Sequence, residues 1–362
     1  MPRKPILIMA GGTGGHVYPA LAVADHLHEH GVPLLWLGTR RGLEARVVPA
    51  KGYTLLTVNV SGLRGKGIVR LIVAPFTVLF ALGQSLLIML RRRPAVVLGM
   101  GGFASGPGGL AAFIMRIPLC IHEQNAVAGL TNRILAPLAN TVMQAFPGTF
   151  GRNGNALVTG NPVRASIATI TTPDDRQDGR SDTALRVLIL GGSQGARVLN
   201  ETLPQVFAAL TSEYVLDIWH QAGESMLEET RGRYRFVNCK ARVAPFIEDM
   251  AAAYSWADIV ICRAGALTIA EIAAAGIASI LVPYPYAVDD HQTANARYLT
   301  DSGAAILLPQ TDFTLEKVCA LLTEFCNARE KLLVMARKAR SLAKPEATRT
   351  VADVCLEVAY AG

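Results

Sequence analysis

Short apolar runs followed by stretches of helical spacing recur along this chain of 362 residues. Pro5–Ala10 is apolar and leads into the glycine loop Gly11–His16. Val17–His30 then carries apolar residues at helical spacing, and Gly31 stands where a helix stop belongs. This order predicts a strand, a tight loop and a helix.

The same design returns in the second half of the chain. Arg186–Leu190 is an apolar run, the glycine loop Gly191–Ala196 follows, and a helical pattern comes next. Two such halves predict an α/β fold of two Rossmann-like domains that face each other across a cleft. We expect a first domain at residues 1–163, a second at 164–345, and a C-terminal helix at 346–362 that packs back on the first. Residues 165–184 are polar and lack periodicity, which predicts a linker or surface loop.

Residues 262–296 look like a binding site. The apolar run Ile259–Ile261 predicts a strand, an Ala-rich helix follows, and Ile280–Val282 predicts a second strand. Such units bind ligands beyond the carboxyl ends of their strands, and a helix N-terminus there favours phosphate. Glu271 on this helix could accept hydrogen bonds from a ribose diol. The alternative is that Thr268 and Glu271 form a capping box with no ligand.

Further polar groups follow other predicted strands. A second glycine loop, Gly99–Gly109, could form an anion pocket together with the first loop. His122–Asn125 and Asp289–Gln292 place polar side chains at strand ends. His16, beside the first loop, is a candidate general base or phosphate-orienting group, although it could also only cap its helix.

Leu71–Leu90 contains no charged residue and is long enough to span a membrane. A polar residue every seventh position, and flanking strands that belong in one sheet, favour a crossover helix instead. The segment is too apolar all round for a helix that covers one sheet face. Docking on an anionic membrane and ordinary burial both remain open. The flanking basic residues are Arg64, Lys66, Arg70 and Arg91–Arg93.

Composition narrows the choices. The chain is 51% hydrophobic and 17% charged, which disfavours disorder, and its net charge of +7 suggests an anionic partner. Six cysteines without a C-x-x-C pair indicate buried thiols in a reducing compartment. The apolar part of the N-terminus is too short for a signal peptide. No D-x-D pair is evident near the glycine loops or residues 262–296, and we interpret Asp174–Asp175 and Asp289–Asp290 as solvated loop charges.

Together these motifs resemble the MurG family of peptidoglycan N-acetylglucosaminyltransferases, in glycosyltransferase family 28. The matching motifs, in order, are GGTGGHVYPALAVA, GMGGFASGPGG, IHEQNAVAGLTNR, GNPVR, GGSQGA and CRAGALTIAEIAAAG with PYPYAVDDHQTANA. The resemblance implies a GT-B fold and inverting transfer of GlcNAc from UDP-GlcNAc to the muramyl 4-hydroxyl of lipid I, giving lipid II. It also implies a peripheral enzyme at the cytoplasmic face of the bacterial inner membrane.

The resemblance implies roles for particular residues. His16 is the candidate base, and Asn125 and Glu271 complete the expected catalytic set. Glu271 would hold the ribose diol, the backbone of Ile247 would read uracil, and Arg164 would lie close to the nucleotide. The remaining expected substrate-binding residues are Thr13, Gly14 and Gly15 over the donor, Ser193, Ala266, Leu267 and Thr268 at the diphosphate, His291 and Gln292 near the sugar, and also Ile269 and Ala270.

The expected partners are UDP-GlcNAc, lipid I, an anionic membrane surface and other cell-wall synthesis proteins, with no nucleic acid. No metal site or fixed cofactor is expected, although Mg²⁺ or Mn²⁺ could stimulate the reaction. Three alternatives stay open: a diacylglycerol glycosyltransferase, a UDP-GlcNAc 2-epimerase, and a non-catalytic nucleotide-sugar-binding subunit.

Overall fold

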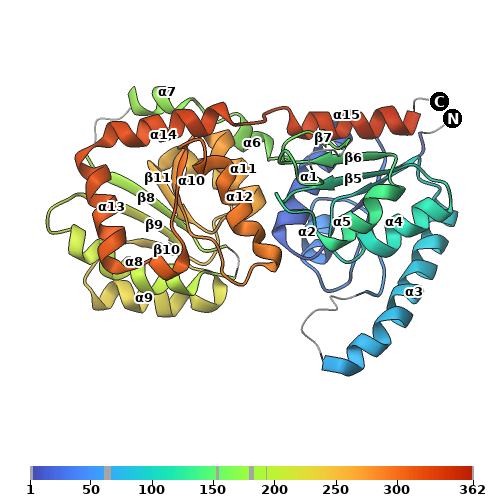
Figure 1. Cartoon of the computed structure of the whole chain (residues 1–362), viewed down its shortest axis with the longest axis horizontal. Helices are drawn as coiled ribbons and strands as arrows, with labels where there is room; N and C mark the ends of the chain where they lie inside the picture. Colours follow the sequence, from blue (N-terminus) through green and yellow to red (C-terminus); the bar gives the residue numbers. More distant parts are fainter. Residues whose placement is uncertain (1–2, 61–66, 152–154, 179–182, 193, 361–362) are drawn as a thin grey trace. The chain divides into compact units, whose positions relative to one another are not determined.

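The computed structural model describes residues 3–60, 67–151, 155–178, 183–192 and 194–360, without the side chains of residues 67–74, 178 and 288. The chain forms two compact units, one of Met1–Arg164 with Pro345–Gly362 and one of Ala165–Lys344. Each unit contains a parallel sheet covered by helices (Figure 1). The predicted α/β fold with two Rossmann-like domains is therefore confirmed. Arg164 and Pro345 both belong to the first unit.

The sheet of the first unit has the strand order β3-β2-β1-β4-β5-β6-β7, and its neighbouring strands are parallel. The order reverses direction between β1 and β4, which is where sheets of this kind bind ligands. The strands are β1 (Ile6–Met9), β2 (Leu34–Gly38), β3 (Leu55–Thr57), β4 (Val96–Gly99), β5 (Leu119–Glu123), β6 (Thr141–Gln144) and β7 (Leu157–Val158).

Two apolar cores cover the two faces of this sheet. One face packs against α1 (Gly14–Glu29), α2 (Glu44–Ala50) and the C-terminal helix α15 (Ala347–Tyr360), which lies along α1 (Figure 1). The other packs against α3 (Gly67–Arg92), α4 (Ser105–Ile114) and α5 (Leu130–Leu135), with the short helix η1 (Ala136–Leu138) after α5. The C-terminal segment is thus part of the core of the first unit.

Two helices begin earlier than the glycine pattern predicts. α1 starts at Gly14, so His16 lies in the first turn of the helix and not in the loop, while the stop at Gly31 (φ 70°) agrees with the prediction. α4 starts at Ser105 and includes three glycines assigned to the second loop, Gly106, Gly108 and Gly109. A Cβ on Gly108 would lie 2.3 Å from Met9 Sδ, and one on Gly109 would lie 2.6 Å from Leu135. These glycines let α4 pack closely.

α3 connects β3 to β4, so the predicted crossover helix is confirmed. Its inward face buries Ala81, Ser85 and Met89, whereas Phe76 and Phe80 on the outer face are 70% and 59% exposed. Ordinary burial of the whole helix is therefore wrong. No helix within the described ranges is long and apolar enough to cross a bilayer. The basic loop at residues 61–66 and the Arg70 side chain lie outside the described part.

The sheet of the second unit has the order β10-β9-β8-β11-β12-β13, again parallel, and reverses between β8 and β11. Its strands are β8 (Leu185–Leu190), β9 (Leu216–Gln221), β10 (Arg242–Ala244), β11 (Ile259–Cys262), β12 (Ala278–Leu281) and β13 (Ala305–Leu307). Its longer helices are α8 (Arg197–Leu210), α9 (Leu227–Phe236), α10 (Met250–Trp256), α11 (Ala266–Ala275), α12 (His291–Thr300), α13 (Leu315–Asn327) and α14 (Arg329–Ser341).

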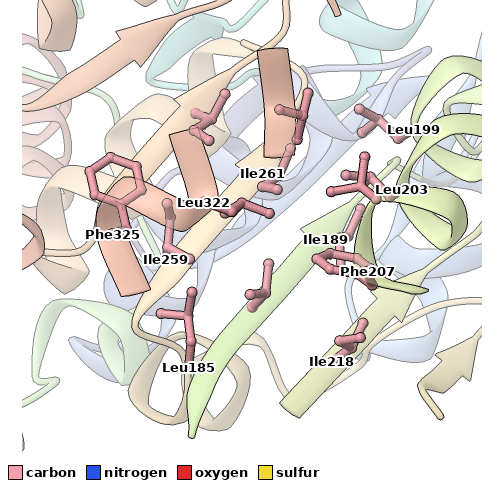
Figure 2. Packing of buried hydrophobic residues seen from close by; sticks show 14 of the residues in the cluster. Leu185, Ile189, Leu199, Leu203, Phe207, Ile218, Ile259, Ile261, Leu322 and Phe325 are labelled. Atoms are coloured by element: carbon pink, nitrogen blue, oxygen red, sulfur yellow. The ribbon is translucent and has the colours of Figure 1, made fainter. Parts of the chain in front are cut away.

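Figure 2 shows the core on one face of this sheet. Leu199, Leu203 and Phe207 of α8 pack over the central strands together with Leu322 and Phe325 of α13. These side chains follow the helical spacing of three or four residues, so each helix presents one apolar stripe to the sheet. The core of this unit fixes the strand ends from which its loops extend.

The linker predicted at residues 165–184 is wrong for half of its length, because α6 (Ala165–Ala168) and α7 (Pro173–Asp178) form there. Arg176 donates hydrogen bonds to the carbonyls of Ala275 and Gly276 at the end of α11. Asp174 pairs with Arg337, which holds the pKa of its carboxyl below the usual value. Asp174 is therefore not a purely solvated loop charge, and distant contacts stabilise these short helices.

The two glycine loops of the first unit touch each other. Gly102 has φ 88°, and a Cβ there would lie 2.3 Å from the carbonyl oxygen of Gly11. Gly101 has φ 92°, and a Cβ there would lie 2.7 Å from His16 Nδ1. Only glycine combines this backbone conformation with so close an approach.

We therefore expect Gly102→Ala to lower the free energy of unfolding by about 2 kcal/mol or more, because it adds both left-handed strain and a backbone clash. Gly83→Ala in α3 is the control: nothing lies within 4 Å of its Cβ position, and a helical alanine should stabilise by about 0.5–1 kcal/mol. Thermal and chemical denaturation measure both. Equal stability of the two variants would contradict the packing described here.

Candidate functional site

The carboxyl edge of the first sheet gathers several predicted site residues. The loops after β1, β4 and β5 all emerge at this edge because the strands are parallel. Thr13 is the N-cap of α1, and its side chain makes no capping hydrogen bond. Gly14, Gly15 and His16 form the first turn of that helix. The structure thus brings the two predicted glycine loops together beside a helix N-terminus, a favourable place for an anion.

A buried carboxylate supports the first loop from behind. Glu44 is fully buried, and it accepts hydrogen bonds from Gly12 N at 3.0 Å, Thr39 N at 2.9 Å and Thr39 Oγ1 at 2.7 Å. The Gly12 N–H is therefore occupied by the protein itself. The sequence analysis did not identify Glu44, because the residues next to it in the sequence give no sign of a contact with a loop more than thirty residues away.

His16 is half-buried, and its Nδ1 lies 2.9 Å from Oε1 of Gln124, the residue after β5. The alternative in which His16 only caps α1 is wrong, since the ring bonds to a different strand end. Gln124 in turn lies against His122, which is fully buried. Gln124 and His122, at the end of β5, thus hold the ring of the candidate base in place.

Asn125 is positioned by its neighbour Glu123. The buried Glu123 carboxylate accepts from Asn125 N at 3.0 Å and Asn125 Nδ2 at 3.2 Å. It also accepts from Gly129 N at 3.0 Å and Asn132 Nδ2 at 2.8 Å. Glu123 therefore organises the loop that carries Asn125. Arg164, at the end of the same unit, places its guanidinium 5.8 Å from the centre of the Tyr18 ring in α1.

In the second unit, α11 begins directly after the turn that follows β11. Its N-cap is Gly265 and has no side-chain cap, so the capping box proposed for Thr268 and Glu271 is wrong. Glu271 is 5% exposed and its Oε2 accepts a hydrogen bond from the Tyr254 hydroxyl at 3.0 Å. The other predicted residues of this helix differ in burial: Ala266 and Ile269 are buried, and Leu267, Thr268 and Ala270 are half-buried.

The loop after β12 is held in place by Gln292, a predicted residue, and by Arg263. Gln292 Oε1 accepts from Tyr284 N at 2.9 Å. Arg263 donates to the carbonyls of Val282 and Pro283, each at 3.1 Å, and to Gln310 Oε1 at 2.7 Å. His291 is the first residue of α12. Both Gln292 and Arg263 thus fix the shape of this loop.

Ile247 lies in the turn between β10 and α10 and is buried. Its N–H donates to Gln221 Oε1 at 3.0 Å. The Ile247 N–H is therefore already bonded within the second unit. Ser193 lies outside the described residues, and the loop around it is tied to β9 by a hydrogen bond from Gly191 N to Gln221 O at 3.1 Å.

Among the residues that the structure describes, no group of three or more His, Cys, Asp or Glu is placed to hold a metal ion.

The predicted residues therefore fall into two groups, each within one unit. The first group is Thr13, Gly14, Gly15, His16, Asn125 and Arg164, and the second is Ile247, Ala266, Leu267, Thr268, Ile269, Ala270, Glu271, His291 and Gln292.

Solved structures share this fold. The crystal structure of Acinetobacter baumannii MurG has a TM-score of 0.84 and 44% sequence identity, covering 98% of this chain and 99% of that one. A UDP-GlcNAc 2-epimerase from Neisseria meningitidis, bound to UDP-GlcNAc, has a TM-score of 0.67 at 12% identity, covering 97% and 99%. The second likeness concerns the fold alone.

Sequence comparison is more specific. Residues 6–144 match the glycosyltransferase family 28 N-terminal domain, and residues 186–351 match the family 28 C-terminal domain. A relative from Nitrosococcus oceani is 52% identical over 354 residues, which is 98% of each chain. That protein is named UDP-N-acetylglucosamine--N-acetylmuramyl-(pentapeptide) pyrophosphoryl-undecaprenol N-acetylglucosamine transferase. With both domain families matched in order, and half of all residues shared with a full-length relative, this chain belongs to glycosyltransferase family 28.

Proposed function

We propose that this protein is an inverting glycosyltransferase that moves GlcNAc from UDP-GlcNAc to the muramyl 4-hydroxyl of lipid I, giving lipid II for peptidoglycan synthesis. The full-length identity to the Nitrosococcus transferase carries this proposal, since that protein's name states the transfer. The geometry of the first unit supports it. His16 is half-buried and lies beside the two glycine loops, which touch each other where the strand order of the sheet reverses.

The reaction needs a base and a stabilised leaving group. The acceptor hydroxyl attacks C1 of the α-linked sugar from the face opposite UDP, which gives a β-linked product. His16 takes the hydroxyl proton, a task for which an imidazole is suited near neutral pH. Negative charge grows on the departing UDP oxygen, and the N-terminus of α11, which lacks a side-chain cap, favours charge at that place.

The second unit would hold the donor. Glu271 accepts hydrogen bonds from the ribose diol, and the Tyr254 hydroxyl keeps its carboxylate in position. Ile247 meets the uracil edge, and Ala266–Ala270 present the first turn of α11 to the diphosphate. Gln292 and His291 lie on the sugar side, as does Asn125 from the first unit. Thr13, Gly14 and Gly15 cover the donor, and Arg164 lies close to the nucleotide.

Divalent cations would act through the substrate. Mg²⁺ or Mn²⁺ would neutralise part of the charge on the departing diphosphate and stimulate the reaction without a fixed protein site. Other cell-wall synthesis proteins would receive or supply the lipid intermediates at the same membrane.

We also propose that the first unit binds the cytoplasmic face of the inner membrane. The outer faces of α3, α4 and α5 expose large apolar side chains on neighbouring helices (Figure 1). Exposed arginines at residues 91–93 and 116 border them and suit anionic lipid headgroups. We call these apolar side chains the apolar patch: Phe76, Leu79, Phe80, Leu87, Leu90, Phe113, Ile114, Leu130 and Ile134.

The direct test of the reaction supplies labelled UDP-GlcNAc and a short-chain lipid I analogue. We expect label in a lipid product with a β-linked disaccharide, and none with diacylglycerol as acceptor. Transfer to diacylglycerol alone would identify the other acceptor class. Conversion of UDP-GlcNAc to its 2-epimer without any acceptor would identify an epimerase, and binding without turnover would identify a non-catalytic subunit.

The same assay separates the roles of His16 and Glu271. We expect His16→Ala to lower kcat by about a hundredfold with little change in KM, because a base acts in the transition state. Glu271→Gln should raise KM for UDP-GlcNAc by about tenfold or more, because a charged hydrogen bond to the diol is lost. Glu213→Gln, at an exposed position, is the control. An unchanged kcat with a raised KM in His16→Ala would make His16 a binding residue.

Membrane binding is tested by co-sedimentation with vesicles. We expect the protein to bind vesicles that contain phosphatidylglycerol more than pure phosphatidylcholine vesicles, and to be released by salt. Replacing Phe76 and Phe80 by serine should weaken binding several-fold. Phe236→Ser in the second unit, where the side chain is 91% exposed, is the matched control. If all three proteins bind equally, the apolar patch is not the membrane surface.

A further inference from the structure

The first unit contains a chain of hydrogen bonds that begins at a backbone carbonyl and ends at His16. At its buried end, His122 Nε2 lies 3.0 Å from the carbonyl oxygen of Gly160. A carbonyl oxygen only accepts, so Nε2 of His122 carries the hydrogen. Thr159 Oγ1, 3.1 Å from the same nitrogen, donates its own hydrogen to Gly160 O at 2.9 Å. Burial lowers the pKa of His122 to about 4, so the ring is neutral and Nδ1 is a bare acceptor.

The accepting atoms of His122 set the orientation of the Gln124 side-chain amide. Its Nε2 lies 3.2 Å from His122 Nδ1 and also 3.2 Å from the backbone carbonyl oxygen of His122. Both of these atoms accept, so the amide nitrogen must face them and the amide cannot be turned over. The amide oxygen therefore faces the other way. It lies 2.9 Å from Nδ1 of His16.

The orientation of the amide decides the protonation of His16. An amide oxygen cannot donate, so the hydrogen in this contact belongs to His16 Nδ1. In the neutral ring Nε2 is then bare, and within the described part of the chain it makes no hydrogen bond. The ring is also confined by Gly101, where an added Cβ would lie 2.7 Å from His16 Nδ1. The base is thus held in one tautomer and one place.

We propose that Gln124, oriented by His122, is a positioning residue that holds His16 in the Nδ1–H tautomer and leaves Nε2 as the proton acceptor. This inference rests on the proposed function, in which His16 is the general base. As the acceptor oxygen bonds to C1 and the bond from C1 to the UDP oxygen breaks, the hydroxyl proton passes to Nε2. The Nδ1–H stays on Gln124, and the imidazolium later returns its proton to solvent. The other tautomer already carries a hydrogen on Nε2 and accepts none.

The tautomer can be observed without any substrate. In the ¹⁵N-histidine spectrum of the full chain at mildly alkaline pH, we expect a protonated Nδ1 and a bare Nε2 for His16, and the reverse for His122. Loss of the signals in His16→Ala assigns them. Gln124→Met has similar volume and no amide, so it should abolish the preference of His16 for the Nδ1–H form. Gln124→Glu keeps an oxygen that accepts a hydrogen bond from His16 Nδ1 and should restore the preference.

Kinetics test the consequence for the reaction. Gln124→Met should lower kcat about tenfold to a hundredfold with little change in KM for UDP-GlcNAc, and Gln124→Glu should recover part of this loss. The matched control is Gln144→Met: Gln144 is also buried, at the end of the next strand, and among the described residues its amide bonds to the backbone of Ala156 and Phe150. It should lose similar stability but keep the His16 tautomer and kcat.

Two results would overturn the inference. One is a wild-type His16 with its hydrogen on Nε2, or a tautomer that does not respond to Gln124→Met. The other is a changed tautomer with an unchanged kcat, which would remove the catalytic consequence. Neither depends on which acceptor is used: if lipid I is not the acceptor, the spectra still report the tautomer, and kcat is measured with whichever acceptor receives the label.

Discussion

The close approach of two backbone segments in the first unit is the constraint on which its site depends. Gly102 lies so near Gly11 that no Cβ fits between them, and both loops leave the sheet where the strand order reverses. Glu44 holds the first of these loops through the Gly12 N–H. A carboxylate there would repel an anion at short range, so the helix N-terminus at Gly14 is the better place for a phosphate.

Each unit has a buried, neutral histidine near the carboxyl end of one of its strands. In the second unit, His220 near the end of β9 bonds to the Tyr234 hydroxyl and to Asn200 Oδ1, each at 2.9 Å, and burial lowers its pKa to about 3. Asn200 then donates to Ala222 O at 2.9 Å, beside the loop that contains Gly195. His122 plays the corresponding part behind Gln124. A neutral imidazole donates on one side and accepts on the other, so it can fix the direction of a whole hydrogen-bond chain.

The sequence predicted the local elements well and the long-range contacts poorly. The strand, loop and helix at the start of each half follow from hydrophobic spacing. Gly31 marked a helix end because its φ of 70° is a conformation that favours glycine. The start of α1 was missed because Gly14 and Gly15 have low helix propensity, and yet both lie in the first turn of the helix. Residues 165–178 were missed because distant elements stabilise them: α6 packs against α10 and α11, and Asp174 and Arg176 of α7 bond to distant residues. The contact of His16 with Gln124 spans 108 positions, and no local spacing reveals it.

Some polar residues of the motifs are already bonded within the protein and support the site. Glu123 holds Asn125, Gln292 holds the loop at Tyr284, and Gln124 holds His16, so these side chains act on the shape of the site. A motif therefore contains both residues that meet the substrate and residues that hold them, and the letters alone do not separate the two. Electrostatic catalysis depends on groups that are oriented before the substrate arrives. Exchanging a supporting residue should thus affect turnover through geometry, even though it never touches the sugar or the diphosphate.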